Sequence, residues 1–583
     1  MRELAIQLPV LLPLCLILLA AALAFREAVT ARQVPALPGA VLLGLSLLAF
    51  FAVLFGYWAG GRSYDVLLGG LIPWSDAAGY FFGAHHLLDT GELTGWSQRR
   101  PIYTALLAGL LALGGRDLQL ALLLQTLFAG AVACFAARAV VARMGPAAGL
   151  LVFALFLAFA GQYAAATMTE NAGFLFGAAG VALLWLGLEK PRASFFAAAG
   201  FFLMLGLTAR AGAFLVIPLL LLWACFAFRG HRRTALRLSL GLLGGVFLAV
   251  LVNQAIDWRA GTDANVPFAN FAYHFYGLAA GGGDWTQVFT DHPELREGGE
   301  SAAYKMAFTL AFERILQNPF DLLTGYAHHL DHAVLHLFQY IPFAPARAAL
   351  YACWLIGLVT AWRHRRDPAC ALLLAATAGT ILSSPFLFSN IGVRVYAATL
   401  PFDAYLTALG LFASVQRFKA LSLPPAAPGL SAQITGMAGL LVALTFLGVL
   451  PLPKAGQSPA PICAGEEIAA VIRLGDEAPL IALRNTPPLA LFPPELRKAD
   501  FVALLHREVH LHEKLKQLPS DSVLITGPAR AGPMEGNAVR IVWQTESLPK
   551  RGSRIGFCLK PGFHPILGRP FREPAKAGPV GLD

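Results

Sequence analysis

The sequence predicts an all-α polytopic membrane protein, with surface helices outside the bilayer and a small C-terminal α/β domain. Of its 583 residues, 57% are hydrophobic and only 13% are charged, whereas a soluble protein carries roughly a quarter charged residues. Apolar runs recur along the chain at roughly the 20-residue length that a helix needs to cross a hydrocarbon core about 30 Å thick. Because lipid offers backbone groups no hydrogen-bond partners, such spans are helices.

Hydropathy along the chain predicts about 12 transmembrane helices. The first of them has a second interpretation as a cleaved signal peptide. A retained span is favoured, because cleavage would leave Arg26 and Arg32 on a translocated end. The predicted spans are 4–24, 39–60, 118–140, 147–164, 171–188, 194–208, 212–228, 238–255, 346–362, 369–388, 395–414 and 430–450.

The distribution of basic residues predicts the orientation of the chain in the membrane. Alternate short loops are rich in arginine and lysine, and the positive-inside rule assigns such loops to the cytoplasm. This bias also accounts for the net charge of +10 without a nucleic-acid partner. The N-terminus, the loops 61–117 and 256–345, and the tail 451–583 are then outside. The cytoplasmic loops hold Arg26, Arg32, Arg138, Arg143, Lys190, Arg192, Arg229, Arg232, Arg233, Arg237, Arg363, Arg365, Arg366, Arg417 and Lys419.

The two long outer loops are predicted to contain helices of their own. In the first loop, residues 76–90 and 102–113 have helical patterns, and we expect both helices to lie along the membrane surface. The second loop begins with polar segments such as "GGGDW". It is then predicted to become helical at 301–316 and again after Pro319.

The tail after residue 450 changes sharply in composition and is predicted to be a small α/β domain. Its apolar runs "APLIALR", "SVLITG" and "VRIVWQ" are typical of strands, and helices are expected near 464–474 and 499–516. Outside the cytoplasm, Cys463 and Cys558 could form a disulfide. No CxxC pair indicates a zinc or redox site. The other cysteines lie in or beside apolar segments: Cys15, Cys134, Cys225, Cys353 and Cys370.

The segment "PWSDAAGYFFGAHHLLDTGEL" from Pro73 to Leu93 is the densest group of ionisable residues at a predicted membrane boundary. Such residues are costly to desolvate, so each is a functional candidate. Asp76 falls at the start of the predicted helix, where Ser75 or Asp76 has the alternative role of a cap. His85 and His86 are candidate substrate contacts, or ordinary interfacial histidines.

Four arginines and a glutamate extend this set of outer candidates. Arg99 and Arg100 precede Pro101, which suits a helix start, and together they could hold a phosphate or simply reach the interface. Glu170 lies in "TMTENAG", where it could also be a helix-start acid beside Thr169. Arg210 and Arg394 stand alone at outer boundaries, against the charge bias.

The segment "GYAHHLDHAVLHLF" is a second polar cluster. His328, His332 and His336 are spaced four residues apart, so on one helix they would share a face. Paired histidines at this spacing can chelate zinc, with Asp331 as a further ligand or an orienting group. The alternatives are contact with a phosphate or acceptor, or a polar stripe on a surface helix. A divalent metal is therefore an open prediction, and no cofactor is required.

The order of these motifs resembles the GT-C superfamily of membrane glycosyltransferases. The likeness is to the branch with the dolichyl-phosphate-mannose protein mannosyltransferases, the aminoarabinose transferases and related bacterial enzymes. It covers roughly residues 39–415. The motifs are "D..GY" from Asp76 to Tyr80, Gly91, "R.P.Y..LLA" from Arg99, the acid Glu170, an "LTR…LP"-like span at Leu207–Pro218, "NP" at Asn318–Pro319, and "R.Y…P" at Arg394–Pro401.

The resemblance implies an enzyme that moves a sugar from a polyprenyl-phosphate carrier to a glycan, lipid or protein acceptor outside a bacterial plasma membrane. It gives Asp76 the role of base, with Glu170 assisting, because a carboxylate can accept the proton of a sugar hydroxyl. The lipid phosphate needs positive charge, for which Arg394 and Arg210 are the first candidates. The further substrate contacts expected are Arg99, Arg100, Tyr80, His85, His86, His328 and His332.

This resemblance divides the chain and leaves other functions open. An extra N-terminal helix and loop (1–38) precede the catalytic module (39–415), followed by a linker with the last helix (416–450) and the tail domain (451–583). One departure is Ala77, where some family members have a second acid. It weakens assignment to the mannosyltransferase subgroup and a two-carboxylate metal site. The alternatives are a polymerase or ligase of lipid-linked glycans, a lipid or solute transporter, and a scaffold for the tail.

Overall fold

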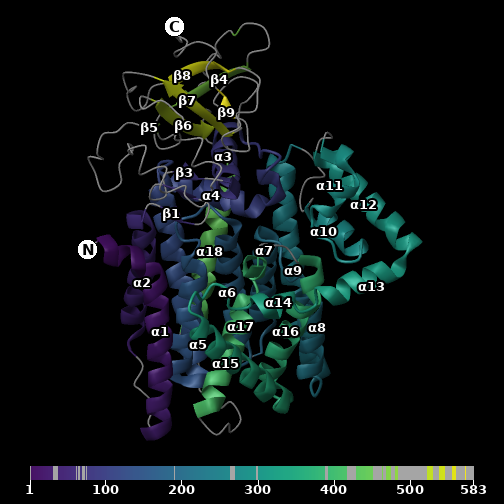
Figure 1. Ribbon diagram of the computed structural model, residues 1–583. Coiled ribbons are helices and arrows are strands. Elements are labelled where there is room, and N and C mark those ends of the chain that lie inside the picture. Colours follow the sequence, from purple (N-terminus) through teal and green to yellow (C-terminus); the bar gives the residue numbers. More distant parts are fainter. Residues whose placement is uncertain are drawn as a thin grey trace.

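The structure is a computed structural model in which a helical bundle carries a group of strands at one end (Figure 1). Besides short strands within 62–73 and after 463, the described residues are 2–30, 37–60, 75–189, 191–262, 270–296, 300–387, 392–415 and 429–450. We call the end of the bundle that bears the strands and helix α3 (Ser75–Thr90) the α3 end.

Eight of the described helices are long and apolar enough to cross a membrane, so the protein is a multi-pass membrane protein. They are α1 (Arg2–Thr30), α2 (Gly39–Gly60), α5 (Leu118–Gly161), α6 (Thr169–Gly187), α9 (Arg232–Ala260), α15 (Ala344–Arg363), α16 (Pro368–Leu387) and α18 (Leu430–Leu447). Shorter apolar helices are α4 (Pro101–Leu113), α7 (Ala193–Ala209), α8 (Val216–Ala227) and α17 (Leu400–Val415). Every predicted span falls on one of these helices, while the total of about 12 crossings stays a prediction.

Helix α5 is a hairpin of two arms, as the separate predicted spans 118–140 and 147–164 require. Gly145 has φ 82° and ψ 172°, which interrupts the helix just before Pro146. A Cβ added to Gly149 would meet Val141 and the carbonyl of Ala137, so the second arm packs back against the first. The reversal depends on a residue that adopts positive φ at little cost, which is glycine.

Helix α4 is the clearest departure from the expected arrangement. We expected residues 102–113 to lie along the membrane surface, but residues 101–111 are buried on every side. A Cβ on Gly109 would overlap the carbonyl of Leu444, and one on Gly448 would overlap that of Ala105. These contacts pack α4 closely against the end of α18. A surface helix needs a polar face, which this apolar segment lacks.

The two long loops fold into helices near the α3 end. The first loop contains β1 (Arg62–Ser63), β2 (Val66–Leu67), β3 (Ile72–Pro73), α3 and η1 (Ser97–Arg99), and the helix predicted at 76–90 is confirmed as α3. The second contains α10 (Asn270–Ala279), α11 (Gln287–Asp291), η2 (Pro293–Arg296), α12 (Glu300–Gln317), α13 (Pro319–His328) and α14 (His332–His336). Helices α12 and α13 confirm those predicted at 301–316 and after Pro319.

The described part of the tail consists of strands. Strand β4 (Ile468–Arg473) pairs antiparallel with β8 (Arg554–Leu559). A second sheet has the order β5 (Leu480–Ala482), β6 (Ser522–Pro528), β7 (Ala538–Gln544) and β9 (Phe571–Arg572). The three predicted strands are confirmed as β5, β6 and β7. The helix predicted near 464–474 is wrong, since β4 occupies this segment, and the helix predicted at 499–516 lies outside the described residues.

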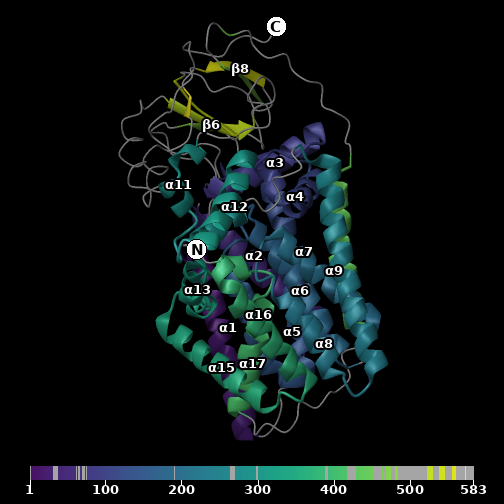
Figure 2. The ribbon, with the colours of Figure 1, turned by 90° about the vertical axis from the view of Figure 1, so that its right-hand side faces the viewer.

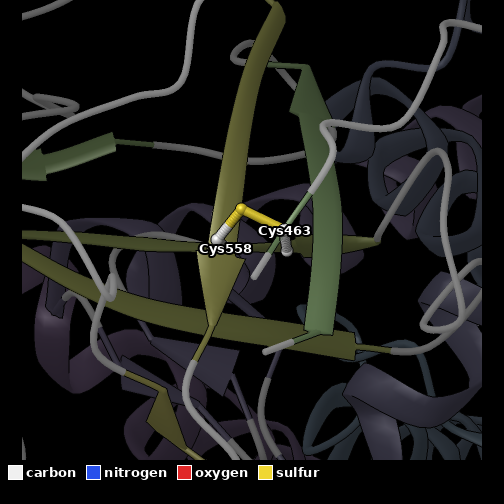
Figure 3. The surroundings of a disulfide bond; sticks show 2 residues. All are labelled: Cys463 and Cys558. Atoms are coloured by element: carbon white, nitrogen blue, oxygen red, sulfur yellow. A yellow bond between two sulfur atoms is a disulfide. The ribbon is translucent and has the colours of Figure 1, made fainter. Parts of the chain in front are cut away.

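A disulfide joins Cys463, which precedes the first tail strand, to Cys558 in β8 (Figure 3). The bond closes a loop across 95 positions and ties the segment after α18 to the sheet. Strands β6 and β7 contact α3, and Figures 1 and 2 show them over this helix. The tail therefore packs on the helix that carries Asp76 in its first turn.

Close helix packing gives a direct test of the bundle. Gly410 of α17 faces α15 so closely that a Cβ would overlap the carbonyl of Cys353, whereas Gly436 of α18 has open space around it. We expect Gly410→Ala to lower stability by about 1–3 kcal/mol through overpacking. Gly436→Ala, the matched control, should be neutral or slightly stabilising through helix propensity. Thermal unfolding in detergent compares them, and equal melting temperatures would contradict this packing.

Candidate functional site

Four charged side chains from separate parts of the chain meet at the α3 end, and Arg394 is at their centre. Its Nη2 donates to Asp76 Oδ2 at 3.2 Å, and its Nε donates to Glu170 Oε1. Arg210 Nε lies 3.4 Å from the same Glu170 oxygen. We call Asp76, Glu170, Arg210 and Arg394 the ionic cluster. Sequence analysis named all four, and the structure brings them together.

The four members differ in their exposure to solvent, and this difference separates their roles. The Glu170 side chain is 0% exposed, and Arg394 and Arg210 are nearly as deeply buried. Asp76 is 33% exposed. A buried carboxylate needs a cation and hydrogen bonds to offset its lost hydration. Glu170 is therefore the buried partner of the two arginines, and Asp76 is the acid of the cluster that solvent can reach.

Arg394 is presented by a short 3-10 turn, η3 (Gly392–Tyr396). The turn starts at Gly392 with φ 64°, and a Cβ there would also overlap the side-chain oxygen of Gln339. At its other end, the Tyr396 hydroxyl contacts His332 Nδ1 at 3.0 Å and donates to Ser384 Oγ at 3.2 Å. Gln339, which follows α14, thus borders the start of the turn, while α14 and α16 hold its end at Tyr396.

Glu170 is set in the first turn of α6 by a dense group of hydrogen bonds. Thr169 Oγ1 donates to Glu170 Oε2 at 3.2 Å. The Asn171 amide donates to the carbonyls of Tyr163, Ala166 and Met168, which fixes the preceding loop. An acid at this position also interacts favourably with the positive end of the helix dipole.

The short segment between α5 and α6 is also joined to the helix that carries Asp76. Thr167 Oγ1 donates to the carbonyl of Ala77 at 2.8 Å. The chain immediately after Asp76 is thereby bonded to the chain immediately before Glu170. This bond sets the separation of the two acids, which Arg394 bridges.

Glycines in α6 allow the arginine-bearing segments to approach. A Cβ on Gly173 would lie 2.9 Å from the Cβ of Arg210 and 3.2 Å from that of Ala397, and a Cβ on Gly177 would overlap Ala398. Contacts this short are incompatible with a larger side chain. The glycines therefore place Arg210 and the residues after η3 beside Glu170.

Tyr80 and Arg100 adjoin the ionic cluster, whereas Arg99 points elsewhere. Burial raises the pKa of the Tyr80 hydroxyl, and the charges of Arg100, Asp76, Arg210 and Glu170 all act on it. Burial lowers the pKa of Arg100 to about 10, so it remains cationic at neutral pH. The Arg99 guanidinium lies 4.2 Å above the Trp96 ring. The predicted arginine pair is therefore split, with Arg100 on the cluster side.

His85 and His86 are further along α3 and do not join the ionic cluster. His85 is nine residues after Asp76, about 13 Å along a helix. It is fully buried, and its ring packs edge-on against Phe81 at 4.6 Å between centroids. His86 is half-buried. The expectation that these histidines contact the substrate is not supported by this placement, because His85 belongs to the core.

The predicted histidine face of 328–336 is wrong, because the helix breaks. Helix α13 ends at His328 and α14 starts at His332, so the three histidines do not share one face. His328 is exposed, while His332 is buried against Tyr396. Among the described residues, no three His, Cys, Asp or Glu side chains are grouped as metal ligands. His332 and His336 remain neighbours, with ring centroids 4.4 Å apart, and a metal bound by residues of this segment stays a prediction.

Several positioning residues were not named from the sequence. Thr167 lies in the quoted "TMTENAG" segment, whose polarity in an apolar chain was a signal for it, whereas Thr169 was named there only as the neighbour of a helix-start acid. Tyr396 lies in the quoted "R.Y" motif. Ser384 had no such signal, because a serine within an apolar helix commonly bonds its own backbone. Its contact with Tyr396 is a property of the tertiary structure.

The cluster has a surplus of positive charge and one open acid. Counting Arg100, three guanidinium groups face the two carboxylates Asp76 and Glu170. The formal net charge of these five groups is therefore +1 (three positive, two negative), and arginine is well suited to phosphate. The exposed carboxylate beside it can accept a proton. A partly exposed acid and a group of guanidinium ions are therefore adjacent at the α3 end.

Comparison with known proteins adds little to this geometry. No family model matches the chain, and no curated protein matches its sequence. Among solved structures, the chain is similar to the oligosaccharyltransferase of Archaeoglobus fulgidus, with 13% identity and a TM-score of 0.38. The match covers 70% of this chain and spans about half (52%) of the length of that enzyme. The helices themselves identify a multi-pass membrane protein.

Proposed function

We propose that the protein is a membrane glycosyltransferase that moves a sugar from a polyprenyl-phosphate-linked donor to an extracytoplasmic acceptor. The observation that carries this proposal is the bridge from Arg394 to both Asp76 and Glu170. This bridge supports the proposal because it joins a partly exposed acid to an arginine, a side chain suited to binding anions, at one end of a membrane bundle. The motifs that resemble the GT-C superfamily contain all three residues.

The packing supports an outward-facing site. Glu170 begins α6 and Arg210 follows α7, so the loop with Arg192 between these helices lies at the opposite end of the bundle. Gly357 and Gly410 pack α15 against α17, and these two helices run in the same direction because α16 reverses the chain between them, so Arg363 lies at the end away from Arg394. Basic loops are cytoplasmic by the positive-inside rule. The disulfide in the tail also suits an oxidising compartment.

In the proposed reaction, Asp76 accepts the proton of the acceptor hydroxyl. The oxygen of that hydroxyl attacks the anomeric carbon of the donor sugar. The bond from that carbon to the lipid phosphate breaks, and the phosphate leaves with the electron pair. Arg394, Arg210 and Arg100 stabilise this leaving group through charge and forked hydrogen bonds. Glu170 is a positioning residue, because its buried carboxylate contacts arginines and not the surface.

Replacement of Asp76 tests the base assignment. We expect Asp76→Asn to lower turnover by roughly 10²–10⁴-fold, because the amide cannot accept the proton. Asp89→Asn is the matched control, since Asp89 lies on the same helix and pairs with Arg116 at 2.6 Å. The measurement is product formation by purified protein from a panel of polyprenyl-phosphate sugars, with and without chelator. Normal turnover by Asp76→Asn would refute the assignment.

Replacement of Glu170 distinguishes a residue that stabilises the ionic cluster from one that takes part in the proposed reaction. Glu170→Gln removes the buried partner of two arginines, and breaking such a pair costs about 3–5 kcal/mol. We expect a lower melting temperature together with lost activity. Asp76→Asn should lose activity alone, because Asp76 is partly exposed. Thermal unfolding of both variants in detergent makes the comparison, and an unchanged melting temperature for Glu170→Gln would contradict its positioning role.

A further inference from the structure

Four large apolar side chains are exposed where α12 meets α13, away from the ionic cluster. Leu316 is 85% and Phe320 73% exposed, and Phe312 and Leu323 are also mostly exposed. They flank the turn at Asn318–Pro319, and we call these four residues the elbow. Such a group on a soluble surface would be unfavourable, so its surroundings need an explanation.

The elbow faces outward because the opposite side of α12 is already packed. Ala303, Ala307 and Ala311 recur every four residues and are buried against α10. This stripe occupies the buried face of α12, and Phe312 and Leu316 lie on the exposed part of the helix surface. Pro319 starts α13 in a new direction. Figure 1 shows the two helices projecting from the side of the bundle and meeting at a tip.

The contacts of α13 show where the elbow lies along the length of the neighbouring membrane helix α16. Tyr326 donates its hydroxyl hydrogen to the carbonyl of Leu382 at 2.8 Å, and its ring packs on Phe386. Leu382 lies five residues before the end of α16, about 7–8 Å along that helix. Helix α16 is long and apolar enough to cross a membrane. Helix α13 therefore lies beside a membrane helix, below the end of its apolar segment.

We propose that the elbow inserts among the acyl chains of the leaflet at the α3 end. Its apolar surface is continuous with the lipid-facing side of α16, where Leu382 is also exposed. In Figures 1 and 2, α12 extends from the elbow toward the α3 end. The exposed Lys305 lies near the start of α12, at the end of the helix far from the elbow, and is therefore farther from the membrane centre. The proposal depends on the multi-pass fold and not on the proposed glycosyltransferase activity.

Insertion would connect the lipid to the ionic cluster through a short path. Helix α13 leads through the turn at His329 to α14, where His332 bonds Tyr396. His329 itself is fixed by the carbonyl of Gly282 at 2.9 Å. Tyr396 is two residues from Arg394. The leaflet would thereby hold the segment that supports the arginine turn.

Spin labels at single cysteines test the position of the elbow. The five free cysteines, Cys15, Cys134, Cys225, Cys353 and Cys370, are replaced by alanine, and the disulfide is kept. Leu316→Cys, Phe320→Cys and the control Lys305→Cys are each labelled in full-length protein in liposomes. Collision rates are measured with oxygen, which concentrates in lipid, and with a water-soluble nickel chelate.

We expect the ratio of oxygen to nickel collisions to be several-fold higher at 316 and 320 than at 305. A higher nickel rate at 316 and 320 would overturn the proposal, because the elbow would then be in water. Low rates with both reagents would also overturn it, because the elbow would then be covered by protein such as a second copy. All three positions are exposed, so the substitutions leave the core intact.

Discussion

The arrangement of the α3 end depends on one guanidinium that binds two carboxylates. Glu170 has no exposure to solvent and must be paired, and Arg394 meets this need while also reaching Asp76. The neighbouring features follow from the same constraint. Gly173 and Gly177 allow the close approach, Gly392 starts the turn, and Tyr396 fixes its far end. If the proposed transfer reaction occurs here, the buried acid provides rigidity, and the partly exposed acid provides chemistry.

Much of the fold could be predicted because lipid leaves a chain few options. Apolar length predicted each span, and "RMGP" around Gly145 falls at the predicted break between two of them. The errors arose where tertiary contacts decide. Helix α4 resembles an interfacial segment by length, but glycine contacts with α18 place it inside the bundle. In β4, sequence pattern alone did not separate a short helix from a strand whose partner, β8, is far along the chain.

The candidate site shows a similar division. Asp76, Glu170, Arg210 and Arg394 were recognisable because charge is rare at an apolar boundary. Their different exposures were not recognisable, since burial depends on which helices meet. Arg99 and Arg100 are adjacent in sequence but separate in space, one over Trp96 and the other beside the cluster. The histidines of 328–336 had helical spacing, yet the turn after His328 removed their common face.

The separation of Asp76 and Arg394 in the sequence has a consequence for biogenesis. The two residues are 318 positions apart. At synthesis rates of about 5–20 residues per second, Arg394 is therefore made roughly 15–65 s after Asp76. Glu170 waits for the same arginine. During this interval Arg210, which follows Glu170 by 40 positions, is the member of the ionic cluster that can already pair with the buried acid. The cluster is therefore complete only after η3 leaves the ribosome.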